Sequence, residues 1–335
     1  MKLHSMMNYL RLTIFLTAFL FFASCETDFD INADWKDITV VYGALNQNDS
    51  IHYIRIQKAF LGKGNVMQMA LEPDSNLYPG KINVMVDEYY NKRLNRRFEL
   101  DTITIYDKDT GRFFNVRQPV FCFPAELSPG FDYHLIIQKP NGEAVSSETP
   151  LVGDFGIIVP VENSTLNFNP PGGAESRMFK WRPARNAGRY QMVMHFNYLE
   201  VNTDTGDSTY HYTEWKSTFI KPGKESNSDI ELAFTNSTFF SMIQNQVEKK
   251  ENVKRYAVDV ELTFYVAASD LSLYIEINEP SSSIVQEKPE YTNITNGLGV
   301  FSARYQKKRV HLLHLNTITK LMEMDGYNFQ WIPTK

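Results

Sequence analysis

Short segments in which apolar and polar residues alternate are the feature of this sequence that most constrains its fold. The alternation is clear in 52–57 (HYIRIQ) and in 190–198 (YQMVMHFNY), and similar segments recur along the chain, separated by Pro, Gly, Asn and Asp. A period of two, with β-branched and aromatic residues, is the pattern of strands that have one buried face. Several short strands with turns between them predict an all-β chain built as antiparallel sandwiches.

The predicted strands fall into two groups. The first group covers 40–45, 52–57, 82–86, 98–105, 113–121 and 133–137, and a further strand ends at Thr149-Pro150. A break is expected at 154–160, before the loop-like segment 167–176, which contains Pro170-Pro171-Gly172-Gly173. The length of 335 residues allows about two domains. We therefore expect an N-terminal β-sandwich domain over 36–155 and a C-terminal one over 156–335.

Both domains are expected to be immunoglobulin-like or fibronectin-like. The segment 127–137 (LSPGFDYHLII) resembles the tyrosine corner of such domains, with Tyr133 as the corner residue. In the second half, Phe179 and Trp181 followed by 190–198 look like the B and C strands of a fibronectin type III-like domain. The residues 203–206 predict a hairpin turn, followed by strands over 209–219 and 256–267.

One segment departs from the strand pattern. Phe239, Ile243 and Val247 recur at a spacing of four residues, which predicts a helix over about 237–250. Ser237 could cap its first turn, and the basic pair at 249–250 suits the negative end of the helix dipole. We expect this short helix to dock on the C-terminal sandwich. A second short helix is expected over 317–324.

The N-terminus has the pattern of a secretory signal. Lys2 and Arg11 precede the apolar run 12–22, and Ala23-Ser24 stands immediately before Cys25. This arrangement resembles a bacterial lipobox, although Phe22 stands where that motif usually has Leu. The resemblance implies a lipoprotein signal peptide over 1–24 and a lipidated Cys25 that anchors the chain in the membrane. The alternative is a free cysteine behind a signal that is cleaved elsewhere.

An acidic tether over 25–35 is expected after the lipobox. Its Glu26, Asp28 and Asp30 resemble the signal that sends lipoproteins of Bacteroidota to the outer face of the outer membrane. A merely solvated tether is the alternative. The expected location is the outer membrane, facing the cell exterior, with periplasmic display left open. The second cysteine, Cys122, lies in an apolar segment and is expected to be a small buried residue.

Two blocks carry a family resemblance. The segment 40–45 (VVYGAL), leading into 53–61 (YIRIQKAFL), and the segment 291–301 (YTNITNGLGVF) resemble an uncharacterised surface lipoprotein family of Bacteroidota, classed as a domain of unknown function. The resemblance implies an anchored all-β protein, often encoded near TonB-dependent outer-membrane receptors. It implies no catalytic residues. Within the second block, Asn296-Gly297 and Gly299 are expected to form a structural turn.

Motifs that support catalysis are missing from the sequence. It contains no His-Glu-x-x-His, Gly-x-Ser-x-Gly, Walker or Gly-x-Gly-x-x-Gly motif. Two cysteines are too few for a Cys-based zinc site, and a net charge of −5 does not suit nucleic acid. We therefore expect no enzymatic activity, no cofactor and no nucleic-acid partner. A surface hydrolase is the least favoured alternative, and it would require acidic residues or a histidine that converge in a pocket.

Three weak metal signals also favour structural roles. His311 and His314 are three residues apart, but no third ligand is placed near them by the sequence. Two pairs of aspartates resemble fragments of calcium-binding loops without the full pattern of an EF-hand: Asp107 with Asp109, and Asp204 with Asp207. Packing or surface histidines and hairpin turns explain these residues better, so no metal site is expected.

The most interesting candidates for binding are aromatic. Tyr210, Tyr212 and Trp215 follow the hairpin turn and could stack on sugar rings or on an apolar partner, so a carbohydrate or peptide ligand is conceivable. Packing against neighbouring strands would use the same rings and is the favoured interpretation. Ser50, Thr102 and Ser208 match an acceptor pattern for O-glycosylation in Bacteroidota.

The sequence as a whole predicts an outer-membrane lipoprotein that acts as a non-catalytic binding or accessory component. The family resemblance suggests a TonB-dependent uptake system as its context. The alternative is a structural or adhesive cell-surface protein, which an exposed and unpaired β edge would favour.

Overall fold

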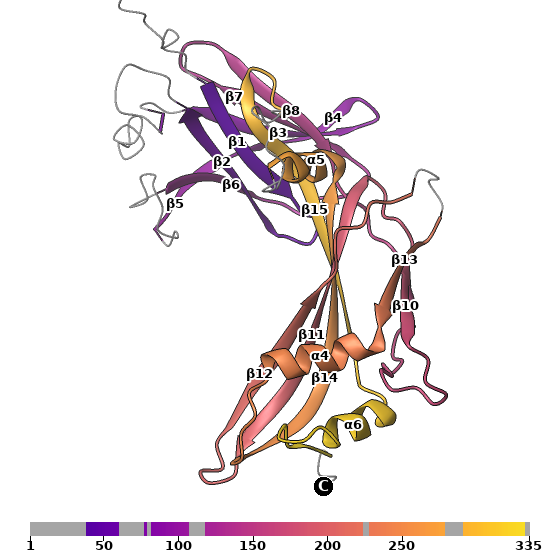
Figure 1. The fold of residues 1–335 in the computed structure, drawn as a ribbon. Helices are drawn as coiled ribbons and strands as arrows, with labels where there is room; N and C mark the ends of the chain where they lie inside the picture. Colours follow the sequence, from indigo (N-terminus) through magenta and orange to yellow (C-terminus); the bar gives the residue numbers. More distant parts are fainter. Residues whose placement is uncertain are drawn as a thin grey trace, which may run out of the picture.

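Two β-rich lobes are stacked end to end and joined by long strands that run through a narrow waist (Figure 1). The computed structural model describes residues 38–59, 77–78, 82–106, 118–223, 228–278 and 291–331. The expected signal peptide (1–24), Cys25 and the acidic tether (25–35) lie outside the described residues. No helix in the described ranges is both long enough and apolar enough to span a bilayer.

The N-terminal lobe is a sandwich of two sheets, the larger of which continues into the C-terminal lobe. Within this lobe, the larger sheet runs in the order β15, β1, β2, β6, β5, and the smaller sheet in the order β4, β3, β7, β8. The bounds are β1 (Ile38–Leu45), β2 (Ile51–Ala59), β3 (Asn83–Tyr90), β4 (Arg93–Glu99), β5 (Asp101–Ile105), β6 (Gln118–Pro124), β7 (Asp132–Gln138), β8 (Ala144–Pro150) and β15 (Gly297–His311). Val41, Ile54 and Phe123 of the larger sheet and Val86 and Leu135 of the smaller sheet are all buried.

The C-terminal lobe has a similar plan, with long strands in its larger sheet and short strands in its smaller sheet. Its larger sheet runs in the order β12, β11, β14, β15, with β16 beside β14, and its smaller sheet is β13, β10, β9. The bounds are β9 (Ile157–Val159), β10 (Ser176–Trp181), β11 (Ala187–Asn202), β12 (Ser208–Lys216), β13 (Ile230–Thr235), β14 (Val253–Ala268) and β16 (Phe329–Gln330). The alternating residues that the sequence predicts as a core face are all buried: Phe179, Trp181, Tyr190, Met192, Met194, Phe196 and Tyr198.

The all-β sandwich prediction is therefore confirmed, and the tyrosine corner is present. The hydroxyl oxygen of Tyr133 accepts a hydrogen bond from the backbone N–H of Ser128 at 2.9 Å. The C-terminal lobe contains a similar contact, in which the hydroxyl oxygen of Tyr190 accepts from the N–H of Ala184 at 2.5 Å. In each lobe a buried tyrosine thus holds the corner that leads into a central strand.

One predicted strand is two strands in the structure. The segment 98–105 is divided at Leu100, where the chain crosses from β4 in the smaller sheet to β5 in the larger sheet. The N–H of Leu100 still donates to the carbonyl of Val84 at 3.0 Å. Apolar and polar residues continue to alternate where the chain crosses between sheets, so the sequence pattern does not reveal the crossing.

The helices differ from their predicted bounds. Helix α4 (Asn236–Gln246) ends before the predicted limit of 250, because Val247 is extended, with φ −102 and ψ 121. Thr235, and not Ser237, occupies the N-cap position and makes no side-chain capping bond. Helix α6 (Leu315–Met322) begins two residues before the predicted 317–324. Helix α5 (Ser269–Asn278) was not predicted.

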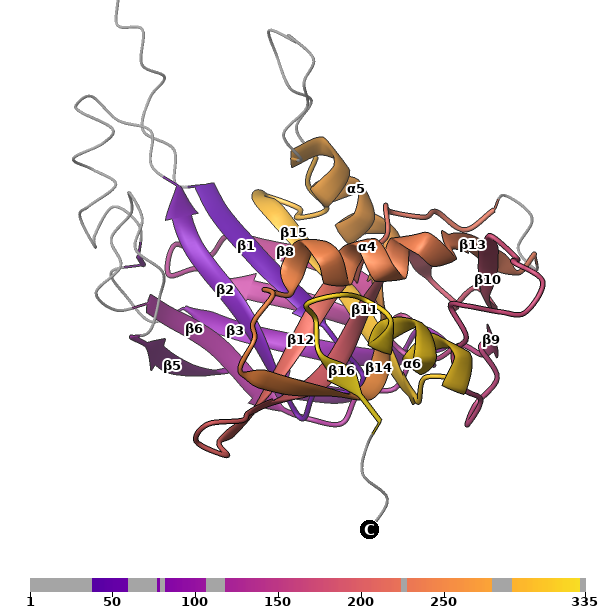
Figure 2. The same ribbon diagram turned by 60° about the horizontal axis from the view of Figure 1, so that its bottom comes forward.

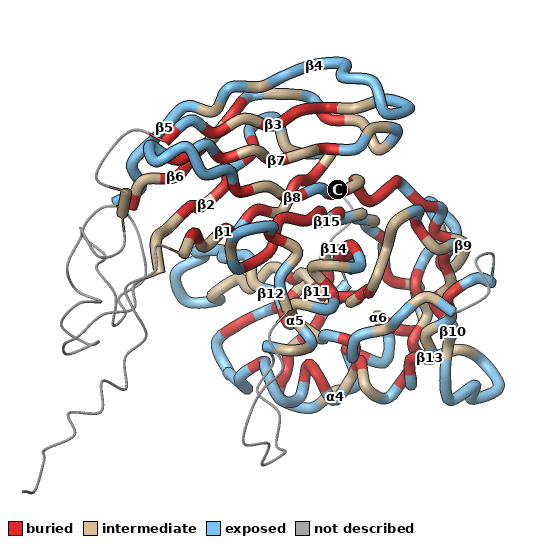
Figure 3. Tube along the Cα trace, turned by 90° about the horizontal axis from the view of Figure 1, so that it is seen from above, coloured by how far each residue is buried: buried red, intermediate tan, exposed pale blue. Residues whose placement is uncertain are grey.

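Helices α4 and α6 lie on the C-terminal lobe, and α5 lies beside β15 at the N-terminal lobe (Figures 1 and 2). Lys250, beyond the end of α4, pairs with Glu200 at 3.0 Å instead of interacting with the dipole of the helix. Buried residues recur along the strands of both lobes, while β5 and nearly all of β4 are exposed (Figure 3).

Strand β15 joins the lobes because it changes partner along its length. From Gly297 to Ala303 it pairs in parallel with β1, and from Arg304 to His311 it pairs antiparallel with β14. The two blocks of the family resemblance therefore lie on adjacent strands. Residues 297–303, which the sequence analysis placed in the C-terminal domain, form part of the sheet of the N-terminal lobe.

Close contact between backbones explains the glycines of β15. Gly299 has φ +102, and a Cβ at this position would collide with the backbone of Val41 in β1. A Cβ at Gly297 would come within 2.7 Å of the carbonyl oxygen of Thr39. Asn296, with φ 59, turns the chain into the strand. This geometry agrees with the prediction that Asn296, Gly297 and Gly299 have a structural role.

The connection between the lobes is also fixed to β15. Asp154, in the segment where a domain boundary is expected, accepts hydrogen bonds from Tyr305 at 2.9 Å and from Lys307 at 2.7 Å. Burial alone would raise the pKa of Asp154, but these bonds outweigh it and hold the pKa below its usual value. The start of the expected break between the domains is thus held against the strand that joins the lobes.

Gly299→Ala tests the importance of the β1–β15 contact. We expect the variant to lower the free energy of unfolding by about 3 kcal/mol, because the methyl group has to push β15 away from β1 in addition to the cost of the positive φ. Urea unfolding followed by tryptophan fluorescence measures the change. The matched control is Gly206→Ala, where φ is also positive, at 79, but no atom lies within 4 Å of the added Cβ. Gly206→Ala should lower the free energy of unfolding by about 1 kcal/mol. Equal losses in the two variants would contradict the explanation that β15 needs Gly299 because it lies so close to β1.

Candidate functional site

The predicted aromatic residues do not form one platform. Tyr210 and Tyr212 are 73% and 63% exposed on the outer face of β12. Trp215 lies an odd number of residues away, so it points to the opposite face, where its ring packs edge-on against Phe234 at 4.9 Å. The structure therefore brings together two of the three residues.

The other predicted residues are scattered over the fold. Ser50, Thr102 and Ser208 are exposed, as an acceptor hydroxyl has to be, but they lie on three separate segments. Cys122, expected to be buried, is only partly buried in β6. Burial, together with the carboxylate of Asp101, raises the pKa of its thiol.

The weak metal signals have structural roles where they can be followed. His311 ends β15, and the ring nitrogen of His314 accepts from the N–H of Asn316 at the start of α6. Asp204 belongs to the hairpin turn, where its N–H donates to the side chain of Asn202 at 2.8 Å. Asp107 and Asp109 lie outside the described residues. Within the described ranges, no group of three or more His, Cys, Asp and Glu side chains could hold a metal ion.

The strongest candidate site is a groove at the waist that sequence analysis missed. It has a volume of about 380 Å³, within the usual range for small-molecule sites. Its floor is the outer face of β11, β14 and β15, where two rows of cross-strand neighbours lie side by side. The rows are Arg189, Ala267 and Arg304, and Gln191, Tyr265 and Gln306.

The fold gives these six residues a common direction. Tyr190, Val266 and Tyr305, which alternate with them along the three strands, are buried. Successive side chains of a strand point to opposite faces, so the floor residues point outward. The small Ala267 lies between two arginines and leaves an opening above the middle strand.

The walls of the groove come from distant parts of the chain. Phe219 follows β12, Ile275 belongs to α5, and Asn46 and Asp49 belong to the turn between β1 and β2. The turn is ordered by its own side chains, since the amide of Asn46 donates to the carboxylate of Asp49 at 2.9 Å. Both lobes therefore contribute to the groove.

Charge in the groove is predominantly positive. Its lining contains the guanidinium groups of Arg189 and Arg304 and the carboxylate of Asp49. Arg304 is 59% exposed and approaches Asp49 at 3.4 Å, so this surface ion pair contributes little stability. Arg189 is buried, with its guanidinium carbon 3.3 Å from the centre of the ring of Phe219. The groove thus combines aromatic surface with two planar cations.

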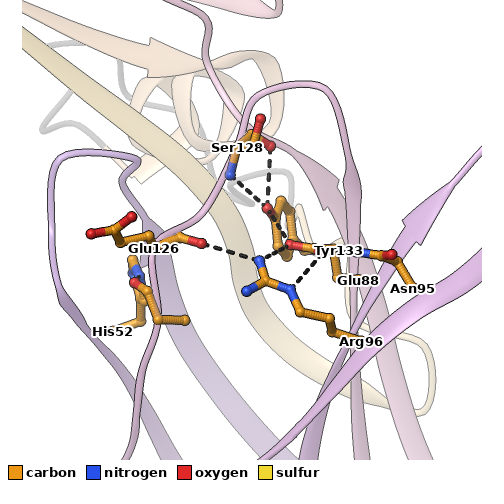
Figure 4. Close-up of polar contacts among 8 residues, drawn as sticks. His52, Glu88, Asn95, Arg96, Glu126, Ser128 and Tyr133 are labelled. Atoms are coloured by element: carbon orange, nitrogen blue, oxygen red, sulfur yellow. Dashed lines mark hydrogen bonds and ion pairs between the residues drawn. The ribbon is translucent and has the colours of Figure 1, made fainter.

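A second polar cluster lies inside the N-terminal lobe (Figure 4). The carboxylate of Glu88 is fully buried and accepts hydrogen bonds from Arg96 at 2.6 and 2.8 Å, from Asn95 at 2.5 Å and from Tyr133 at 3.0 Å. Burial by itself would raise the pKa of Glu88, but the bonds from Arg96, Asn95 and Tyr133 outweigh it and lower the pKa. All these partners are side chains of the protein itself, and the cluster includes the tyrosine of the corner.

Glu88→Gln tests the role of this buried charge. We expect a loss of about 3 kcal/mol in the free energy of unfolding near pH 7, since the variant leaves Arg96 without its carboxylate partner. The folded pKa of Glu88 is depressed, so its stabilisation is present above the unfolded pKa of about 4.3 and is lost as the pH falls through the folded pKa. Urea unfolding at several pH values should therefore show a difference between wild type and variant that narrows below about pH 4.

The exposed Glu99 on β4 provides the control for this prediction. Glu99→Gln should change the free energy of unfolding by less than about 0.5 kcal/mol. A pH-independent difference between wild type and Glu88→Gln would contradict the assignment of the stabilisation to the ionised carboxylate.

The sequence contains only part of the signal for the groove. Alternation identifies the outward residues of each strand, but it does not give the register that aligns Arg189, Ala267 and Arg304. The walls depend on α5 and on the packing of the β1–β2 turn against the waist. Neither feature follows from local pattern.

Comparisons with known proteins add no functional assignment. No family model and no curated protein matches the chain. Among solved structures, one similarity is to "Crystal structure of CBD12 from CALX1.2", with 10% sequence identity over 82% of this chain and 99% of that chain. Its TM-score of 0.18 is too low to support any argument about fold or function. The β-sandwich class therefore rests on the strand pairing described above.

Proposed function

We propose that this chain is a lipid-anchored outer-membrane protein that binds a small ligand in the waist groove, as a non-catalytic component of a TonB-dependent uptake system. The observation that carries the binding role is the groove itself. It is concave, has mixed aromatic and polar walls, and is formed by segments of both lobes. These properties are typical of ligand sites.

The anchor and the receptor come from the sequence. The lipobox ending at Cys25 supports the anchor, and the blocks at 40–45 and 291–301 support the link to a TonB-dependent receptor. An anchor at Cys25 is compatible with the shape of the molecule. Strand β1 begins at Ile38, at the end of the N-terminal lobe farthest from the β11–β12 hairpin (Figure 1). The tether would then hold this lobe near the membrane and leave the groove accessible.

Cys25→Ala tests the anchor. The variant should move from the membrane fraction to the soluble fraction and lose labelling by a fatty-acid analogue, because the acyl chains have no other attachment site in the lipobox. Cell fractionation and labelling measure both effects, and Cys122→Ala is the matched control that should keep both. Continued labelling of the Cys25→Ala variant would contradict the anchor.

Purification from native membranes tests the accessory role. A tagged wild-type chain should recover a TonB-dependent receptor in near-stoichiometric amount, identified by mass spectrometry. The Cys25→Ala variant should recover much less, because it is no longer held in the plane of the membrane. Wild-type samples that contain the tagged chain alone would count against the receptor association.

A structural or adhesive role is the second candidate, because β12 is an edge strand. Near one end of this edge, the amide of Gln246 pairs with the backbone N–H and carbonyl of Glu214 at 2.8 and 2.7 Å, as a neighbouring strand would. Residues 208–212 continue the edge and present Tyr210 and Tyr212. Exposed edges can pair with another chain. Recovery of untagged copies of the same chain in the purification, lost in Tyr210→Pro, would favour this role.

A further inference from the structure

The waist groove has an asymmetric chemistry that points to one class of ligand. In one row of its floor, Ala267 lies between Arg189 and Arg304. Strands of a sheet are about 4.8 Å apart, so the two arginine positions are separated by about 10 Å across the alanine. An anionic group placed above Ala267 would lie between the positions of these two arginines.

The second row of the floor is suited to a different part of the same ligand. Tyr265, 45% exposed, lies between Gln191 and Gln306. Together with Phe219 and Ile275 it supplies aromatic and aliphatic surface next to the arginine row. An apolar or aromatic body could pack here while its anionic end reaches the arginines.

Arg304 is the arginine that is best placed to bind an anion. Its contact with Asp49 is a single approach at 3.4 Å, longer than the usual 2.7–2.9 Å of a charge-assisted hydrogen bond. The side chain is 59% exposed, so its planar fork remains accessible. Arginine binds planar oxyanions such as carboxylate through two parallel hydrogen bonds.

From this arrangement we infer that the groove binds a small amphipathic anion, an aromatic or aliphatic body that carries one carboxylate or sulfonate group. The anion lies over Ala267 and is bound by Arg304, with Arg189 on its other side. The body lies on Tyr265 and Phe219. This inference rests on the proposed function and specifies the ligand class.

Two fluorescent probes with the same ring systems test the inference. The anionic probe is 8-anilino-1-naphthalenesulfonate, and the neutral one is N-phenyl-1-naphthylamine. Each is titrated into the full chain carrying Cys25→Ala, which avoids detergent. We expect the anionic probe to bind at least about tenfold more tightly than the neutral one, because only the sulfonate can form charge-assisted bonds with Arg304.

Two variants with matched controls locate the binding. Arg304→Gln should lower the affinity for the anionic probe about tenfold and the affinity for the neutral probe less than about twofold. Tyr265→Ser should lower the affinity for both probes. The controls are Lys308→Gln, on the same face of the same strand but outside the groove, and Tyr212→Ser, another exposed tyrosine of this sheet face. Both controls should bind the two probes as the parent protein does.

The possible failures are distinguishable. Equal affinity for the two probes, or an anionic affinity that Arg304→Gln leaves unchanged, would overturn the anionic ligand class. If Tyr265→Ser still weakened both probes, the groove would remain a binding site. If Tyr265→Ser behaved like Tyr212→Ser, or if neither probe bound, the groove and the proposed binding function would both be rejected.

Discussion

The rest of the structure depends on the double pairing of β15. Its first half lies beside β1 and its second half beside β14, so one continuous strand belongs to both lobes. The close approach to β1 requires glycine at 299, where a side chain would enter the backbone of Val41. The groove floor begins at Arg304, the residue at which the strand changes partner. The geometry of the groove is therefore a consequence of the way in which the lobes are joined.

Two carboxylates, the exposed Asp154 and the buried Glu88, hold different parts of the structure in place. Asp154 holds the connection between the lobes to Tyr305 and Lys307 of β15. Glu88 holds the tyrosine corner of the N-terminal lobe through Arg96 and Tyr133. Each carboxylate accepts several hydrogen bonds. For the buried Glu88, these bonds offset the cost of removing its charge from water.

The alternation of apolar and polar residues is sufficient to predict most strands and the two sandwiches. Tyr190, Met192, Met194, Phe196 and Tyr198 were recognised as a buried face because burial on one side of a strand imposes a period of two. Alternation does not predict the change of sheet at Leu100, because it does not reveal which strand lies beside a given segment. It also failed for α5 and for the groove, whose residues are brought together only by register and by packing between the lobes. The odd spacing of Trp215 from Tyr212 was readable in the sequence and already excluded a single aromatic platform.

The parallel pairing of β1 with β15 has a consequence for the order in which the molecule can be assembled. β1 is the first described strand of the chain, and its neighbour on one side comes from residues 297–303. A polypeptide that emerges from a ribosome or a translocon with its N-terminus first presents β1 long before this neighbour exists. Contacts between residues so far apart in sequence form slowly. The N-terminal lobe therefore cannot complete its sheet as an independent early domain, and the two lobes become native together.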